Sequence, residues 1–488
     1  MRRLLTAGLL LLSTLALPAA ATGATVPGTS SNFELVGRNG LFGRGMNSAP
    51  AIYKDYIYIG NRSDGTPGRP NPGISVVRIA DPRRPRVVAE LNPPDAGNIG
   101  ESTRELRVWP QKRLLIVESV SCSRALHACT PTSVTPTFKF FDLTGRNAAR
   151  PKLIATYVPA QVPHEFFLWA DPKQRGRALI YYTNSTTTTT VDSLIAVDIS
   201  RARQGFFRQI SSWRGTHLYS EADRESRDIF LHSLDVSGDG KRTYLAHWGG
   251  GMLVLDTSDL AADKPFPEMR LRTVPAATPI WPNVSAHAVS KIPGRPFVLV
   301  GDEVFGTESQ GIKPFFDKQK QGCPWGWVHV LDVANEVRPT LVGDYKIEEN
   351  SETSCQKPES QEPRASFAAH NMTSLRNVAF ATWYSGGLRA ISLANPARPT
   401  EAGFYVPKPL RSVWTEDPPV TGGSQKVEMW SFPIIKDGLV YVVDVRNGLY
   451  ILRYTGRFGD EVKRIKFLEG NSNLGDRARL ERPAGRAR

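Results

Sequence analysis

The sequence lacks the motifs that mark the most familiar classes of enzyme. It contains only four cysteines and eight histidines in 488 residues, and no two cysteines stand in a CxxC pair. No GxSxG elbow, glycine-rich phosphate loop or HExxH sequence occurs. Beyond the N-terminus no run approaches the roughly twenty apolar residues of a membrane helix. Lys and Arg are not clustered with interleaved aromatics, so we expect neither a membrane span nor a nucleic-acid partner.

The N-terminus has the pattern of a secretory signal peptide. Arg2 and Arg3 precede an apolar run from Leu4 to Pro18, which is followed by small residues up to Ala24. A positive start, an apolar centre and an Ala-x-Ala-like site are typical of export signals. We therefore predict a signal peptide over residues 1–24, and no cysteine lies nearby to carry a lipid anchor. The mature chain is expected to be secreted.

The cysteines fit an oxidising compartment. Cys122 and Cys129 flank a short loop, so a disulfide between them is expected, which leaves Cys323 to pair with Cys355. Their spacings do not suit a zinc site.

The charge balance is strongly basic, with a formal net charge of +14 and an isoelectric point near 9.6. A basic exported protein can associate with anionic cell-wall polymer. The preference of a GC-rich genome for arginine explains the same balance equally well.

One pattern of strands and turns recurs along the chain and is clearest at its third strand. Each copy is short, rich in β-branched or aromatic residues and bounded by Gly or Asp/Asn, as strands are. The turn after it often carries Pro, which cannot sit inside a ladder. The seven copies are GISVVRIADP from Gly73, TFKFFDLTG from Thr137, SLIAVDIS from Ser193, GGMLVLDTS from Gly250, GWVHVLDVA from Gly326, GGLRAISLA from Gly386 and NGLYILRYT from Asn447.

Seven four-stranded units of about sixty residues predict an all-β fold, a seven-bladed β-propeller. The segment Phe33–Gly37 resembles the fourth strand of the other units but precedes the first one. It is therefore expected to supply the outer strand of the last blade and to close the ring. The predicted domains are the signal peptide, a propeller over residues 32–456 and a basic tail over residues 457–488 whose last dozen residues look disordered. A closed ring needs no partner to fold, so a monomer is expected.

The third strand and its Pro turn resemble a known repeat. GISVVRIADPRRPRVVAEL and GGLRAISLANPARPTEAGFY are similar to the LVIVD repeat of bacterial and archaeal secreted β-propellers. The segment Ala368–Pro399 is a particularly close match, and the resemblance covers roughly residues 32–456. It implies the fold and a secreted protein, but no activity, because propellers host many unrelated functions.

Histidines recur at one position of the repeat. The first strand of a blade lines the channel of a propeller, and four consecutive blades begin that strand with histidine: His164, His232, His287 and His370. The equivalent positions in the other blades lie near Met46, Arg104 and Trp430. Imidazoles that converge from several blades suit Cu, Fe or Zn. The opposing interpretation is that each histidine packs inside its own blade.

The turns between the second and third strands lie on the same face and are rich in polar and aromatic groups. Glu165 directly follows His164 and is a further polar candidate near the channel mouth. The long segments around the second cysteine pair are expected to form a lid beside the channel mouth. The candidate ligand-binding residues in the turns are His247, Trp248, Asp302, Glu303, Trp383 and Tyr384.

Two functions from different classes follow from these features. The first is a secreted binding or scaffold protein that recognises an extracellular ligand or protein through the His-rich channel face. The second is a metal-dependent oxidoreductase, with Cu or Fe held by the four histidines. A hydrolase that uses Asp302 and Glu303 has no partner motif in its favour.

Overall fold

The computed structural model describes residues 28–482, apart from 67, 69–72, 124–126, 128, 130–131, 305–322, 359–365 and 417–422. The predicted signal peptide, most of the predicted lid and the last six residues lie outside the described residues.

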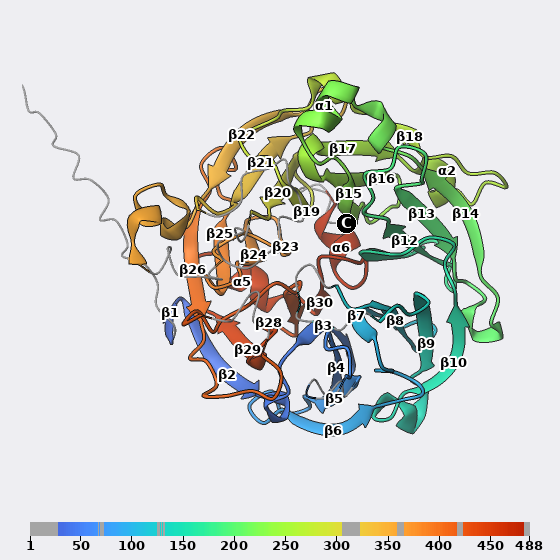
Figure 1. Ribbon diagram of the computed structural model, residues 1–488, viewed down its shortest axis with the longest axis vertical. Coiled ribbons are helices and arrows are strands. Elements are labelled where there is room, and N and C mark those ends of the chain that lie inside the picture. Colours follow the sequence, from blue (N-terminus) through green and yellow to red (C-terminus); the bar gives the residue numbers. More distant parts are fainter. Residues whose placement is uncertain are drawn as a thin grey trace, which may run out of the picture.

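The strands form antiparallel four-stranded meanders arranged around an axis (Figure 1). The first four meanders follow one another along the chain. They consist of β3 (Asn47–Tyr53), β4 (Tyr56–Asn61), β5 (Ile74–Arg78) and β6 (Arg86–Leu91); β7 (Glu101–Trp109), β8 (Leu114–Ser121), β9 (Thr137–Asp142) and β10 (Lys152–Tyr157); β11 (Phe166–Ala170), β12 (Ala178–Thr183), β13 (Leu194–Asp198) and β14 (Arg208–Trp213); and β15 (Leu231–Val236), β16 (Arg242–His247), β17 (Gly251–Asp256) and β18 (Arg270–Leu271).

The later meanders also contain strands from the two ends of the chain. They consist of β19 (Ala286–Lys291), β20 (Phe297–Asp302), β21 (Val328–Asp332) and β22 (Thr340–Tyr345); β23 (Met372–Ser374), β24 (Val378–Thr382), β25 (Leu388–Ser392) and β26 (Thr400–Val406), with β1 (Thr29–Ser31) on their edge; and β27 (Ile434–Lys436), β28 (Leu439–Asp444) and β29 (Gly448–Tyr454), with β2 (Phe33–Asn39) and β30 (Phe467–Leu468).

Helical segments are short and lie in the connections. They are η1 (Leu41–Gly43), η2 (Gly145–Ala148), η3 (Ala202–Gln204), η4 (Thr216–Leu218), α1 (Glu221–Ser226), η5 (Trp248–Gly250), α2 (Ser258–Ala261), η6 (Pro275–Ala277), η8 (Glu348–Asn350), η9 (Ser354–Gln356), α5 (Gly459–Lys463) and α6 (Arg477–Leu480).

The fold is a β-propeller, as predicted. The first strands of successive meanders contact one another from β3 through β7, β11, β15 and β19 to β23, and β28 contacts β3. The first two meanders share one eight-stranded sheet, because Asn61 of β4 pairs with Thr103 of β7. The count of seven blades stays a prediction from the repeat.

The ring is closed by the N-terminal strand that the sequence indicated. β2 pairs antiparallel with β29 along its length, from Phe33 opposite Tyr454 to Asn39 opposite Leu449. Apolar side chains between neighbouring sheets hold the ring together, such as the fully buried Phe167, Trp169 and Leu253. Each side chain of this kind contributes about 1.5–3 kcal/mol when it leaves water.

Both predicted disulfides are present. Cys122 bonds to Cys129 with their Cα atoms 6.1 Å apart, and Cys323 bonds to Cys355 with their Cα atoms 5.5 Å apart. None of the helices in the described part of the chain has the length and apolar character needed to cross a bilayer.

The C-terminal tail is folded against the ring as far as Arg482, whereas its composition predicted disorder in the last dozen residues. Asn473 donates one hydrogen bond to the carbonyl of Ala170, at the end of β11, and another to the carbonyl of Gly238, in the turn after β15. In Figure 1 α6 lies near the centre of the ring. The tail therefore covers the end of the channel at which the first strands finish, and the histidines lie where those strands begin.

Candidate metal centre

The four repeated histidines meet at the axis. The ring centroids are 4.3 Å apart between His164 and His232, 3.9 Å between His232 and His287, and 3.9 Å between His287 and His370. Nε2 of His164 also lies 2.9 Å from Nε2 of His232. The histidines thus form one continuous cluster across four blades.

β-Bulges explain how a strand residue comes to face the axis. His232 is an extra residue between Leu231 and Ser233 in the pairing of β15 with β16, and His287 occupies the same place between β19 and β20. Arg104 is the corresponding extra residue between β7 and β8. A bulge residue has no partner opposite it, so its side chain is turned out of the ladder, which is a common device beside functional sites.

The contacts of His370 determine which of its nitrogens can bind a ligand. Its Nδ1 lies 2.6 Å from the carbonyl oxygen of Trp430, and because a carbonyl only accepts, Nδ1 carries the proton. In the neutral ring Nε2 then has a lone pair, yet Nε2 lies 3.3 Å from Oε1 of Glu303. A lone pair that faces a carboxylate is stabilised by a proton or a metal ion shared between the two groups. A backbone carbonyl that fixes the tautomer in this way is also typical of metal-binding histidines.

Two carboxylates approach the same nitrogen of His287. Oε1 of Glu165 lies 3.9 Å from its Nε2, and Oε2 of Glu303 lies 3.6 Å from it. Two sets of ligand atoms, each within 4.8 Å of one another, consist of Glu165, His232 and His287, and of His287, Glu303 and His370. All five side chains are buried, with at most 8% of their surface exposed.

Burial keeps most of the cluster uncharged. It lowers the pKa of His164, His232 and His287 well below the ordinary value, so these rings are neutral near pH 7 and can act as ligands. Burial likewise raises the pKa of Glu165 to about 8.

Tyr384 donates a hydrogen bond to Oε1 of Glu303 and has a positive φ of 42°, which is rare for an aromatic residue.

A small cavity lies against the cluster, with a volume of about 30 Å³. Of the seven first-strand positions found in the sequence, Arg104, the four histidines and Trp430 line it, whereas Met46 does not. The sequence did not point to Arg62, Glu105, Asn371 or Ser431, which complete the wall. Arg62 follows β4 and lies over the ring of Trp430, 4.4 Å from its centroid. It directly follows the second strand of its blade, as Glu303 does, so the same turn position could have pointed to it.

The candidate ligand-binding face divides into two groups. Glu303 and Tyr384 line the cavity, whereas His247, Trp248, Asp302 and Trp383 are buried and do not line it. Trp248 stacks on Phe230 at 5.4 Å.

Asp302 is held by internal hydrogen bonds. It accepts from Nε1 of Trp281 at 2.5 Å, from the backbone of Ser285 at 3.2 Å and lies 3.1 Å from Nε2 of His329. Nδ1 of His329 in turn lies 2.5 Å from Asp344, and the two carboxylates raise the pKa of His329. These contacts hold the Asp302 carboxylate inside the blade.

His247 provides a test of how burial affects acid stability. Burial lowers its pKa to about 3, and neither ring nitrogen has a partner among the described residues. As the pH falls, the imidazole of His247 is protonated in the unfolded chain at a higher pH than in the folded one. The stability that the neutral buried ring allows is therefore complete above about pH 6.5 and is lost progressively toward pH 3. Between pH 6 and pH 4 we expect the free energy of unfolding of His247→Phe to fall less steeply than that of the wild type, by about 1.4 kcal/mol per pH unit. Urea unfolding at a series of pH values measures both slopes, and parallel curves would contradict the assignment.

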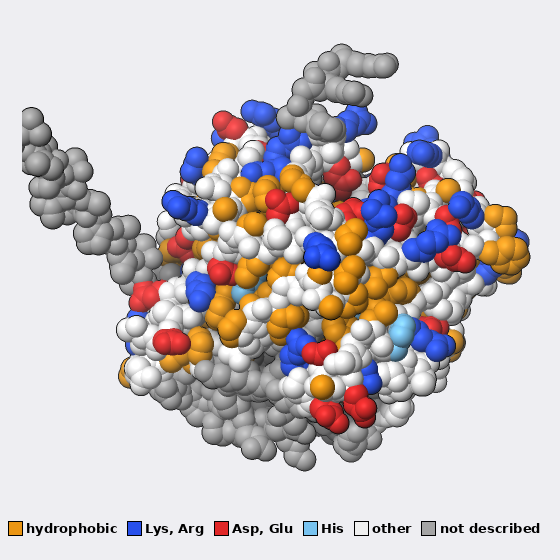
Figure 2. Space-filling view, turned by 90° about the horizontal axis from the view of Figure 1, so that it is seen from above, with side chains coloured by type: hydrophobic (Ala, Val, Ile, Leu, Met, Phe, Trp, Pro, Cys, Tyr) orange, Lys and Arg blue, Asp and Glu red, His pale blue; other side chains and the backbone are white. Residues whose placement is uncertain are grey.

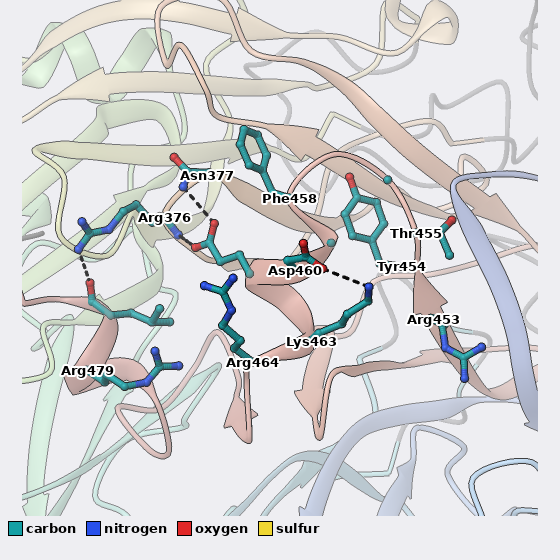
Figure 3. A pocket seen from close by; sticks show the side chains of 14 residues that line it. Arg376, Asn377, Arg453, Tyr454, Thr455, Phe458, Asp460, Lys463, Arg464 and Arg479 are labelled. Carbon is teal, nitrogen blue, oxygen red and sulfur yellow. Dashed lines mark hydrogen bonds and ion pairs between the residues drawn. The ribbon is translucent and has the colours of Figure 1, made fainter.

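A larger hollow of about 860 Å³ lies where the tail meets the ring (Figure 3). Most of its charged residues are already paired. Lys463 bonds to Asp460 at 3.1 Å, and Glu461 accepts from the backbone of Arg376 and from Asn377. The contacts of Glu461 dock the tail onto the ring. In the view of Figure 2, basic and acidic side chains are interspersed and do not form one basic patch.

No protein-family model matches the chain, and no curated protein is detectably similar to it in sequence. Among solved structures, the chain is similar to Sqt1 of Saccharomyces cerevisiae, with 10% identity over 85% of this chain and 98% of that chain and a TM-score of 0.49. It is also similar to Sqt1 from Chaetomium thermophilum (12% identity, 83% of each chain, TM-score 0.45) and to the C-terminal WD40 domain of Sif2 (8% identity, 86% of this chain, 98% of that chain, TM-score 0.46). The resemblance to the LVIVD repeat stays a prediction.

Proposed function

We propose that this β-propeller binds one divalent transition-metal ion on its axis. The carrying observation is that His287 brings its ligand atom within 4.8 Å of those of His232 and Glu165 in one set, and of those of His370 and Glu303 in the other. One ion per chain is expected, because both carboxylates approach the same Nε2 of His287.

The chemistry of the donors narrows the choice of ion. Each set offers two imidazoles and one carboxylate, which suit Zn, Cu or Fe, whereas Ca and Mg prefer oxygen ligands alone. His164 bonds to His232 and is placed to orient it as a second-layer residue. The bound ion would supply Lewis acidity, and the oxidoreductase interpretation has no further observation in its favour.

A binding role agrees with the fold, since β-propellers serve as binding proteins or scaffolds in general. We extend the proposal to an exported protein of the LVIVD-repeat type. The two disulfides support export, because such bonds persist in oxidising compartments. The burial of the histidines favours an ion over a macromolecule as the occupant of this site.

Metal titration tests the proposal. Protein prepared without a chelating tag and stripped with a chelator is titrated with Zn²⁺, Cu²⁺ and Fe²⁺ in separate experiments. We expect one equivalent of at least one of these ions to remain bound after gel filtration, as measured by elemental analysis. Protein that retains none of the three would refute the proposed function.

A further inference from the structure

The guanidinium of Arg104 has more donors than acceptors in its surroundings. Its Nη1 lies 3.1 Å from Nδ1 of His164, and its Nη2 lies 3.0 Å from Nε2 of the same ring. A neutral imidazole has only one nitrogen that accepts, so one of these two contacts cannot be a hydrogen bond. Nε of Arg104 is buried without a partner, and no carboxylate of the described residues lies within ion-pair distance of this side chain.

The charges around the cavity are unbalanced once an ion is bound. Its wall contains two arginines, Arg62 and Arg104, together with Glu105, Glu165 and Glu303. Glu105 is already paired with Arg107 at 2.9 Å. The two remaining carboxylates can offset the divalent ion, which leaves the charge of Arg104 in excess. A cation-rich, buried cavity of this kind favours an anion.

The size of the cavity limits what this anion can be. Since one water needs about 10–15 Å³ of such space, a volume of about 30 Å³ holds the ion and only a small group beside it. A nucleotide, sugar or peptide is too large.

We infer that the metal centre takes a small anion, which binds between the ion and the guanidinium of Arg104. This inference rests on the proposed function and names the class of its ligand. The anion bridges two positive groups, so its negative charge is stabilised from both sides, and the free donors of Arg104 gain the acceptor that His164 cannot supply.

Azide binding to the Cu²⁺-loaded protein tests the inference. The charge-transfer absorption of a copper–azide complex is followed for the wild type, Arg104→Met, Arg104→Lys and Arg203→Met, and the copper content of each sample is measured as well. Arg203 is a surface residue bonded to Asp142, so its replacement makes the same change in net charge away from the site.

We expect wild type and Arg203→Met to bind azide equally well. Arg104→Met should keep its copper and bind azide about 10- to 100-fold more weakly, since one charge-assisted hydrogen bond is lost, with Arg104→Lys between the two. Equal azide affinity in Arg104→Met and wild type, or copper-loaded wild type that binds no azide, would overturn the inference. Wild type that retains none of Zn, Cu and Fe would refute the proposed function itself and the inference with it.

Discussion

Replacing His287 with phenylalanine is expected to abolish stoichiometric metal binding. His287 belongs to both sets of candidate ligands, and its Nε2 faces Glu165 and Glu303. A phenyl ring can keep the packing against His232 and His370, whose ring centroids each lie 3.9 Å away, but it has no nitrogen to coordinate an ion. Because loss of an outer-layer partner alone costs about 10- to 100-fold in affinity, loss of a shared ligand should cost at least ~100-fold. Elemental analysis and competitive titration against a chelator measure the loss.

The matched control is the same substitution at His247. That ring is also fully buried, but it stacks on Tyr219 at 5.2 Å and belongs to neither set of ligands. His247→Phe should bind metal as the wild type does. Equal metal affinity in His287→Phe and His247→Phe would show that the ion, if one binds, is held elsewhere.

Replacing Arg477 with alanine is expected to lower the free energy of unfolding by about 3–5 kcal/mol. The guanidinium of Arg477 lies 3.0 and 2.8 Å from the two oxygens of Asp235, and both side chains are at most 1% exposed. The pair joins the tail to the first strand of a blade. Without Arg477 the carboxylate of Asp235 keeps only the backbone hydrogen bond from Lys291 and is left buried as an unpaired charge. Urea unfolding measures the change.

Two further variants separate this pair from a general effect of arginine. Arg479 lies in the same helix and pairs with Asp476, but it is 52% exposed, so Arg479→Ala should cost less than about 1 kcal/mol. Combining Arg477→Gln with Asp235→Asn removes both charges and should recover most of the loss. Arg477→Ala should still bind metal when folded, because the pair lies at the other end of the channel. A loss below 1 kcal/mol in Arg477→Ala would mean that the tail contributes little to the fold.

The features that could be predicted from the sequence are those that the repeat displays. The closing strand β2 and the convergence of four histidines follow from residues at equivalent places in successive units, and the two disulfides follow from the spacing of the four cysteines. His164, His232, His287 and His370 could be found because a residue that begins the first strand of consecutive blades must face the same channel end. Glu165 could be predicted as a polar group of the same channel end because it directly follows His164.

The remaining features depend on contacts that no single repeat contains. The bulges that turn Arg104, His232 and His287 toward the axis depend on a shift between two strands, and the alternation of residues in one strand does not show it. Turn residues divide likewise: Glu303 enters the cavity, whereas the preceding Asp302 is held by Trp281 and His329. The Arg-rich composition of the tail predicts disorder, because the sequence does not show that Arg477 pairs with the buried carboxylate of Asp235.

The most direct test of the metal centre is anomalous diffraction from crystals of the protein loaded with the ion that binds in titration. We predict one strong peak on the propeller axis, about 2.0–2.2 Å from Nε2 of His287 and within coordination distance of the other two members of one set, either His232 and Glu165 or His370 and Glu303. A peak at a surface histidine such as His217, or no peak in crystals of protein that had taken up the ion, would contradict the central claim.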